Sequence, residues 1–244
     1  MEATRSAKEG DVKKSVVEIA MEETRKTFLP PYDEETTQHE RAYDVKNMSG
    51  EDAWDQMSKV ITAVSHKDDW RTSLCNERNA FPESIRSVLS GFDDNLSKNK
   101  EDARKTKIML FLRHMLSFNE NARLLGGKKT AEEFSEMTNI PDVVVVQLLK
   151  VFATKKERGY GFSKTLEDKR KLWILLLFVL GAGGKKCKCG DMSALLGEMS
   201  LDVKTASELL KQAGVTVKKG KDSVSAELKV PLVFPGPKRG GGKK

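Results

Sequence analysis

Cysteine is scarce in this chain, with three residues among 244, at positions 75, 187 and 189. An odd number of unevenly spaced cysteines does not provide a disulfide framework, so we expect a protein of a reducing compartment. Aromatic residues are also few, at 7% of the chain. A large aromatic binding platform is therefore not expected.

Long apolar runs are missing as well. The most apolar stretch, Leu172–Leu180, has nine residues and lies between basic residues on both sides. A membrane-spanning helix needs about 20 apolar residues, so this stretch predicts a buried helix. The first residues, MEATRSAKEGDVKK, contain no apolar segment, and we expect no signal peptide.

The sequence has no phosphate-binding loop of the Walker type. That motif needs a glycine five positions before its Gly-Lys pair and a Ser or Thr after the lysine. Around the pair Gly184-Lys185, these places hold Val179 and Lys186. The glycines more simply end a helix, with Gly181 or Gly183 in the left-handed conformation.

Metal and catalytic motifs are not recognisable either. A structural zinc site usually has four ligands, and Cys187 and Cys189 supply two, while Cys75 and the three histidines are scattered. We interpret Cys187 and Cys189 as loop cysteines near the surface and expect no metal. No catalytic arrangement of His, Ser, Cys and carboxylate occurs at a known spacing, so we expect neither an enzyme nor a cofactor.

The charge of +7 is unevenly distributed. Residues 150–244 contain 21 lysines and arginines against 9 acidic residues, whereas residues 1–149 contain 22 against 27. A basic C-terminal part indicates a polyanionic partner such as nucleic acid. The alternative is that these lysines only keep a small domain soluble.

The N-terminal part is predicted to consist of two linker regions. Residues 1–48 read as an extended strap with one helix in KKSVVEIAMEETRKTF, stopped by two prolines, and with Tyr32 and Tyr43 as packing anchors. Residues 49–99 read as a helical linker with a helix over 50–64, capped by Ser49 and Asp52, and a second helix beginning near Pro82.

Two units with the same order of elements follow. In residues 100–166 we expect a helix from Glu101, a short helix with a Thr130–Glu133 capping box, a helix from Pro141 and a glycine-containing hairpin. In residues 167–235 the order recurs, with a third helix that ends at Gly214, before a basic flexible tail at 236–244. The fold class is mainly α with small β-hairpins (α+β), as tandem winged-helix domains.

Basic residues of these units are the candidates for DNA contacts. Their side chains are mostly lysines, which suit phosphate neutralisation, so we expect little sequence preference and a steep salt dependence. The candidates are Lys204 and Lys211 in the last helix, Lys218, Lys219 and Lys221 in the wing, Lys238 and Arg239 in the tail, and Lys155, Lys156, Arg158 and Lys164 around the first hairpin, which would continue the same track.

The valine run 143–146 in the third helix of the first unit is too apolar to read bases, so we expect it to pack within the protein.

Two alternatives to DNA binding stay open. One is a winged-helix module for protein–protein interaction, and the other is a general transcription factor that is not stably bound to a polymerase.

Several stretches together resemble one family. LPPYD followed by AYD, GFSKTLEDKRKLWILLLFVL, DMSALLGEMSLDVKTASELLKQAGVTVKK and SAELKVPLVFPGPKR occur in this order within residues 29–239. They are similar to the RNA polymerase I subunit of forty-nine kilodaltons, whose C-terminal half is related to TFIIE. The CKC loop and the glycine-rich tail depart from that pattern.

The resemblance implies a nuclear, nucleolar tandem winged-helix subunit that binds DNA near the cleft of RNA polymerase I. It would support initiation and elongation on ribosomal RNA genes, with polymerase core subunits as partners. Full-length members also carry an N-terminal TFIIF-like β-barrel that pairs with a partner subunit. We expect this chain to lack the barrel, and a TFIIF-like partner subunit stays an open alternative.

Overall fold

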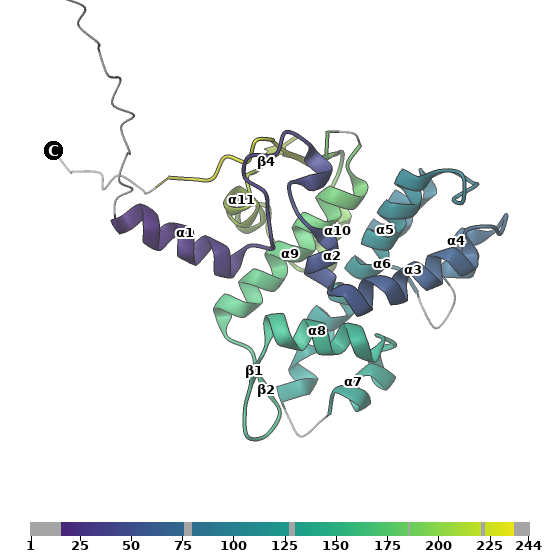
Figure 1. Cartoon of the computed structure of the whole chain (residues 1–244), viewed down its shortest axis with the longest axis horizontal. Helices are drawn as coiled ribbons and strands as arrows, with labels where there is room; N and C mark the ends of the chain where they lie inside the picture. The colour runs from purple at the N-terminus through teal and green to yellow at the C-terminus, as the bar shows by residue number, and fades with distance from the viewer. Residues whose placement is uncertain (1–15, 76–79, 127–129, 185, 221–222, 237–244) are drawn as a thin grey trace, which may run out of the picture.

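The computed structural model describes residues 16–75, 80–126, 130–184, 186–220 and 223–236. The described chain is mainly helical, with two small antiparallel sheets (Figure 1). The predicted fold class, mainly α with small hairpins, is confirmed.

The α-helices are α1 (Val16–Phe28), α2 (Val45–Ser49), α3 (Glu51–Val64), α4 (Trp70–Leu74), α5 (Glu83–Ser90), α6 (Lys100–Asn121), α7 (Ala131–Thr138), α8 (Asp142–Phe152), α9 (Lys164–Ala182), α10 (Ser193–Glu198) and α11 (Val203–Gln212). The strands are β1 (Thr154–Lys155), β2 (Tyr160–Gly161), β3 (Lys188–Cys189), β4 (Val215–Lys219) and β5 (Val224–Leu228), and short 3₁₀ helices lie at His39–Arg41 and Ala122–Gly126.

Two long helices, α6 and α9, pack against each other at the centre of the molecule. Every residue of Leu172–Leu180 is buried, which confirms that this apolar run is a core helix. A helix that is apolar on all sides must be covered on all sides, and here α6, α8, α11 and the second sheet cover α9. Within the described parts of the chain, no helix has the length and apolar character needed to cross a membrane.

The first unit consists of α6, α7, α8 and the β1–β2 hairpin. The predicted capping box is present, because the Thr130 hydroxyl accepts from the Glu133 N–H and the Glu133 carboxylate accepts from the Thr130 N–H. Pro141 is the N-cap residue of α8, as its place before Asp142 predicts. The hairpin pairs Thr154 with Gly161.

The second unit consists of α9, β3, α10, α11 and the β4–β5 hairpin. Its antiparallel sheet has the order β3-β5-β4, and the edge strand β3 was not predicted. Asp202 caps α11 by accepting from the Thr205 N–H, and Gly214 follows the helix with φ of +70°. The predicted stop at Gly214 is therefore confirmed.

The predicted capping box at the start of α3 is wrong. Ser49 is the last residue of α2, and its hydroxyl donates to the Lys46 carbonyl. Gly50 is the N-cap residue of α3, with φ of +81° and no side-chain cap. The sequence pattern failed because a second short helix, capped by Asp44, ends directly before α3 and takes up Ser49.

The glycines after the apolar run act differently from the prediction. Gly181 lies inside α9 against Met109, and Gly183 has φ of −66°, so neither is left-handed. Gly183 is needed for space. A Cβ there would lie 2.5 Å from the Val179 carbonyl oxygen and 2.6 Å from the Cys187 Cα, both backbone atoms.

Replacement of Gly183 by alanine should therefore destabilise the protein by about 1–3 kcal/mol, because two backbone segments would have to separate. Gly184→Ala is the matched control, since a Cβ at Gly184 meets no atom within 4 Å. Urea unfolding of both variants measures the difference. Equal free energies of unfolding would contradict the steric role of Gly183.

The segment between α1 and α2 packs on the second unit through Tyr32 and Tyr43, which the sequence indicated as packing anchors without indicating what they pack against. Tyr32 and Tyr43 form an isolated antiparallel bridge, and the Tyr32 ring packs edge-on against Phe234 with 5.1 Å between ring centroids. Tyr43 is buried, and its hydroxyl donates to the Ala213 carbonyl at 2.8 Å. Burial raises the pKa of this hydroxyl, so it is a neutral donor at all ordinary pH values.

Tyr43→Phe should lower the free energy of unfolding by about 1–2 kcal/mol, because the Ala213 carbonyl loses its buried donor. Tyr32→Phe, at the half-buried neighbouring ring, is the control and should have a smaller effect. Chemical denaturation compares the two. A larger loss for the Tyr32 variant would contradict this account of the anchor.

Candidate nucleic-acid interface

The last helix of the second unit, α11, presents two of the predicted lysines to solvent. Lys204 and Lys211 are exposed, and their seven-residue spacing places them on one face. Glu208 is also exposed, four residues after Lys204 and three before Lys211, so it lies between them on this face. The α11 surface is therefore of mixed charge.

The β4–β5 hairpin separates its two described lysines. Successive residues of a strand point to opposite faces, so Lys218 and Lys219 point apart. Lys218 lies on the outer face, 3.7 Å from the Glu227 carboxylate on β5. Lys188 on β3 pairs in register with Glu227 and adds an exposed cation to the same face.

Three predicted residues, Lys221, Lys238 and Arg239, lie outside the described part of the chain. The predicted DNA-contact residues on α11 and the second sheet that the structure describes are thus Lys204 and Lys211 on α11 and Lys218 and Lys219 on β4. All of them are exposed, so they can reach a polyanion without rearrangement of the core.

The basic residues of the first unit are at the β1–β2 hairpin. Lys155, Lys156 and Arg158 are exposed, and the Lys156 side chain lies over Gly161. Lys164 is the first residue of α9 and forms an ion pair of 2.8 Å with Asp168. The hydrogen bond to Asp168 raises the pKa of Lys164, which keeps it charged but already paired.

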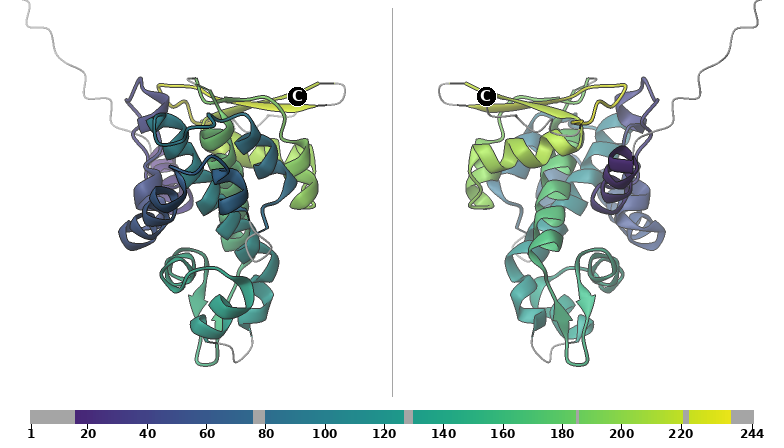
Figure 2. Two further views of the ribbon diagram at one scale, coloured as in Figure 1. Left: turned by 90° about the vertical axis from the view of Figure 1, so that its right-hand side faces the viewer. Right: turned by 90° about the vertical axis from the view of Figure 1, so that its left-hand side faces the viewer.

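The two basic groups are far apart. The β1–β2 hairpin directly precedes the N-terminus of α9, while β3 follows its C-terminus and contacts it there. Nineteen residues of helix separate the two ends, which is about 28 Å at 1.5 Å per residue. Figure 2 shows the hairpin and the second sheet at opposite ends of the molecule. The expected single basic track is therefore split into two groups.

The third helix of the first unit has a different surface. Val144 and Val145 are buried, as predicted, but Val143 and Val146 are 40% and 58% exposed. The expectation that the whole valine run packs inside is wrong for these two. They lie three residues apart on one face of α8, so this helix offers an apolar strip where α11 offers lysines.

Two features of the candidate interface differ from the sequence-based expectations. Glu208 could have been found, since its spacing from Lys204 and Lys211 already places it on their face. The place of Lys188 on a strand, rather than in a loop, could not be found, because a two-residue edge strand leaves no periodic pattern.

Comparison with known proteins gives one result that decides the family. The family model described as A49-like RNA polymerase I associated factor matches residues 1–235. The chain belongs to this family. A search of curated proteins finds no match. The family that the sequence resembles is therefore confirmed. Members of this family are factors associated with RNA polymerase I.

In this family member, the CKC segment is not a surface loop. Cys187 and Cys189 are 4% and 1% exposed, so the prediction of surface cysteines is wrong. Cys189 lies in β3 with its side chain toward the core, and Cys187 follows the close approach at Gly183. Among the residues described, no group of three or more His, Cys, Asp or Glu side chains could hold a metal ion.

Burial raises the pKa of Cys187 to about 11 and that of Cys189 to about 12. The thiolate is the reactive form, so both should resist iodoacetamide at pH 8 in the folded protein. Cys75 is only half-buried and should be alkylated first. Peptide mass spectrometry after a time course reports the order, and fast labelling of Cys189 would contradict its burial.

Proposed function

We propose that this chain is a non-catalytic, DNA-binding tandem winged-helix subunit of RNA polymerase I. It works in the nucleus and nucleolus, where it supports initiation and elongation on ribosomal RNA genes. Its DNA contacts go mainly to the phosphate backbone, with little sequence preference. Membership of the polymerase I associated family supports the setting, and the lysines of the second unit support the DNA contact.

The observation that carries the proposal is the surface of the second unit. Its order of helix, strand, two helices and a two-stranded hairpin supports a winged helix. Such domains place the third helix in the major groove and the hairpin on the backbone. Here these two elements carry Lys204 and Lys211, and Lys218 and Lys219, on a unit fixed by the buried α9.

The carboxylates beside these lysines affect the affinity and the salt dependence that we expect for DNA binding. Glu208 lies between the lysines of α11, and Glu227 pairs with Lys218. DNA would have to compete with these carboxylates, so the described surface favours moderate affinity with strong salt dependence. We expect the tail residues Lys238 and Arg239 and the wing residue Lys221 to add further cations.

The proposal predicts a specific effect of charge reversal in the wing. In the full chain, Lys218→Glu with Lys219→Glu should weaken duplex DNA binding by a similar factor for unrelated sequences. The slope of log K against log salt should become shallower by about 2, if each lysine neutralises one phosphate. Fluorescence anisotropy at several salt concentrations measures both quantities.

The matched control is Lys155→Glu with Lys156→Glu at the other hairpin. It changes the net charge equally but lies at the opposite end of α9, so it should have the smaller effect. If the wing variant keeps its affinity and its slope, the second unit is not the DNA-binding surface.

One observation favours a second candidate function, docking of a protein on the first unit. Val143 and Val146 expose an apolar strip on α8. Co-purification with RNA polymerase I by the wing variant would show that protein contacts, rather than DNA, hold the chain to the polymerase. Loss of co-purification in Val146→Glu, with DNA binding intact, would assign those contacts to this strip.

A further inference from the structure

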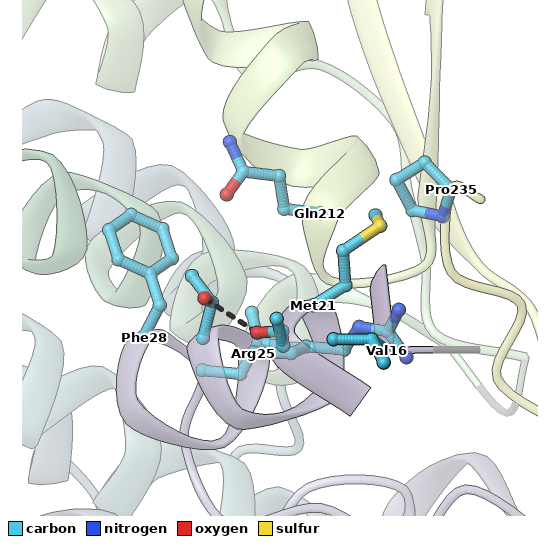
Figure 3. A pocket seen from close by; sticks show the side chains of 9 residues that line it. Val16, Met21, Arg25, Phe28, Gln212 and Pro235 are labelled. Carbon is cyan, nitrogen blue, oxygen red and sulfur yellow. Dashed lines mark hydrogen bonds between the residues drawn. The ribbon is translucent and has the colours of Figure 1, made fainter. Parts of the chain in front are cut away.

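An apolar groove lies on the second unit, beside the C-terminal end of α11. It has a volume of about 530 Å³, and its walls come from α1, from the end of α11 and from the segment at Pro235 (Figure 3). Met21 and Phe28 line it from α1, and Gln212 lines it from α11. Three segments far apart in the sequence thus form one hollow.

The wall made by α1 is held at one end. The indole N–H of Trp173 donates to the Phe28 carbonyl at 3.2 Å, and the Arg25 guanidinium lies 4.4 Å from the centroid of the Phe234 ring. At the other end of the helix, Val16 and Ile19 are 83% and 47% exposed. The apolar face of α1 is therefore only partly covered by the described chain.

The charged residues that line the groove and the hollow beside it have one sign, and the glutamates of α1 (Glu18, Glu22 and Glu23) are not among them. Arg25 is the one charged side chain among the described lining residues. A second hollow shares Pro235 with the first, and its charged lining residues are Lys211 and Lys229. No described carboxylate lines either hollow, and Glu22 on α1 pairs with Lys26 instead. An occupant of the groove would thus meet apolar side chains and three cations.

The two ends of this chain have the wrong composition to fill the groove. The C-terminal residues 237–244 consist of one proline, three glycines and four basic residues. Residues 1–15 contain only Met1, Ala3, Ala7 and Val12 as apolar residues, within a polar and charged sequence. The basic end directly after the groove wall strengthens the preference for an acidic occupant from another protein.

We propose that this groove docks an acidic amphipathic helix of a partner protein. Its apolar side chains, at helical spacing, would enter between α1 and α11, as in other helix-in-groove interfaces. Its carboxylates would meet Arg25, Lys211 and Lys229 at the rim. The inference goes beyond the proposed function and depends neither on DNA binding nor on the polymerase.

The test uses the full chain and three labelled model peptides. The first has leucines at i, i+3, i+4 and i+7 with glutamates on the flanks, the second has lysines in place of the glutamates, and the third has serines in place of the leucines. Fluorescence anisotropy should give a dissociation constant in the micromolar range for the first peptide. The other two should bind at least about tenfold more weakly, which corresponds to about 1.4 kcal/mol.

Two variants of lining residues, Met21→Glu and Arg25→Glu, and one control variant test whether the peptide binds in the groove. Met21→Glu should weaken binding of the first peptide at least about tenfold, because it places a carboxylate on the apolar wall. This factor corresponds to a loss of about 1.4 kcal/mol in binding free energy. Met137→Glu, at a 54% exposed methionine on α7 of the first unit, is the matched control and should leave binding unchanged, with circular dichroism as the folding check for both variants. Arg25→Glu should shift the preference from the glutamate peptide toward the lysine peptide, which a loss of folding would not do.

Equal binding of the glutamate and lysine peptides would overturn the proposal, and so would equal effects of Met21→Glu and Met137→Glu. No binding of any peptide at millimolar concentration would also overturn it. Each of these results leaves the DNA-binding proposal untouched, because no nucleic acid is present in the assay.

Discussion

The rest of the structure depends on the contact between α6 and α9. The apolar run of α9 is buried on all sides, and Ile108–Leu116 of α6 is buried as well. The first unit contacts this pair through Phe152, whose ring packs edge-on against Trp173 with 5.0 Å between centroids. The second unit covers the other side of α9 with α11 and β3. Because both units share one helix pair, the chain has one continuous core rather than two separable ones.

Polar groups inside this core add specificity to the packing. Arg113 and Arg170 are 7% and 5% exposed, and they donate to neutral oxygens, the Asn139 carbonyl and the Asn119 side chain. Burial lowers the pKa of both guanidinium groups, which is a cost to stability rather than a gain. Their hydrogen bonds have fixed directions, so they favour one register of α6 against its neighbours over alternative apolar packings.

Local signals made much of the fold predictable, and tertiary contacts explain the rest. Thr130 with Glu133, Pro141 and Gly214 mark element ends by chemistry within a few residues, so the sequence alone locates them. Gly183 and Cys187 depend on a close approach of two backbone segments, which no local pattern encodes. The candidate interface depends on tertiary structure even more, since α9 separates the β1–β2 hairpin from the β4–β5 hairpin and places them at opposite ends of the molecule.

The position of Lys211 connects the two surfaces of the second unit. It is exposed on the α11 face that carries Lys204, and it also lines the hollow beside the apolar groove. A single ammonium group can neutralise a phosphate or a carboxylate, but it cannot fully neutralise both at once. If both proposals hold, an acidic helix in the groove would weaken the proposed DNA contacts of α11. DNA would weaken binding of that helix by the same factor, because coupling between two sites is reciprocal.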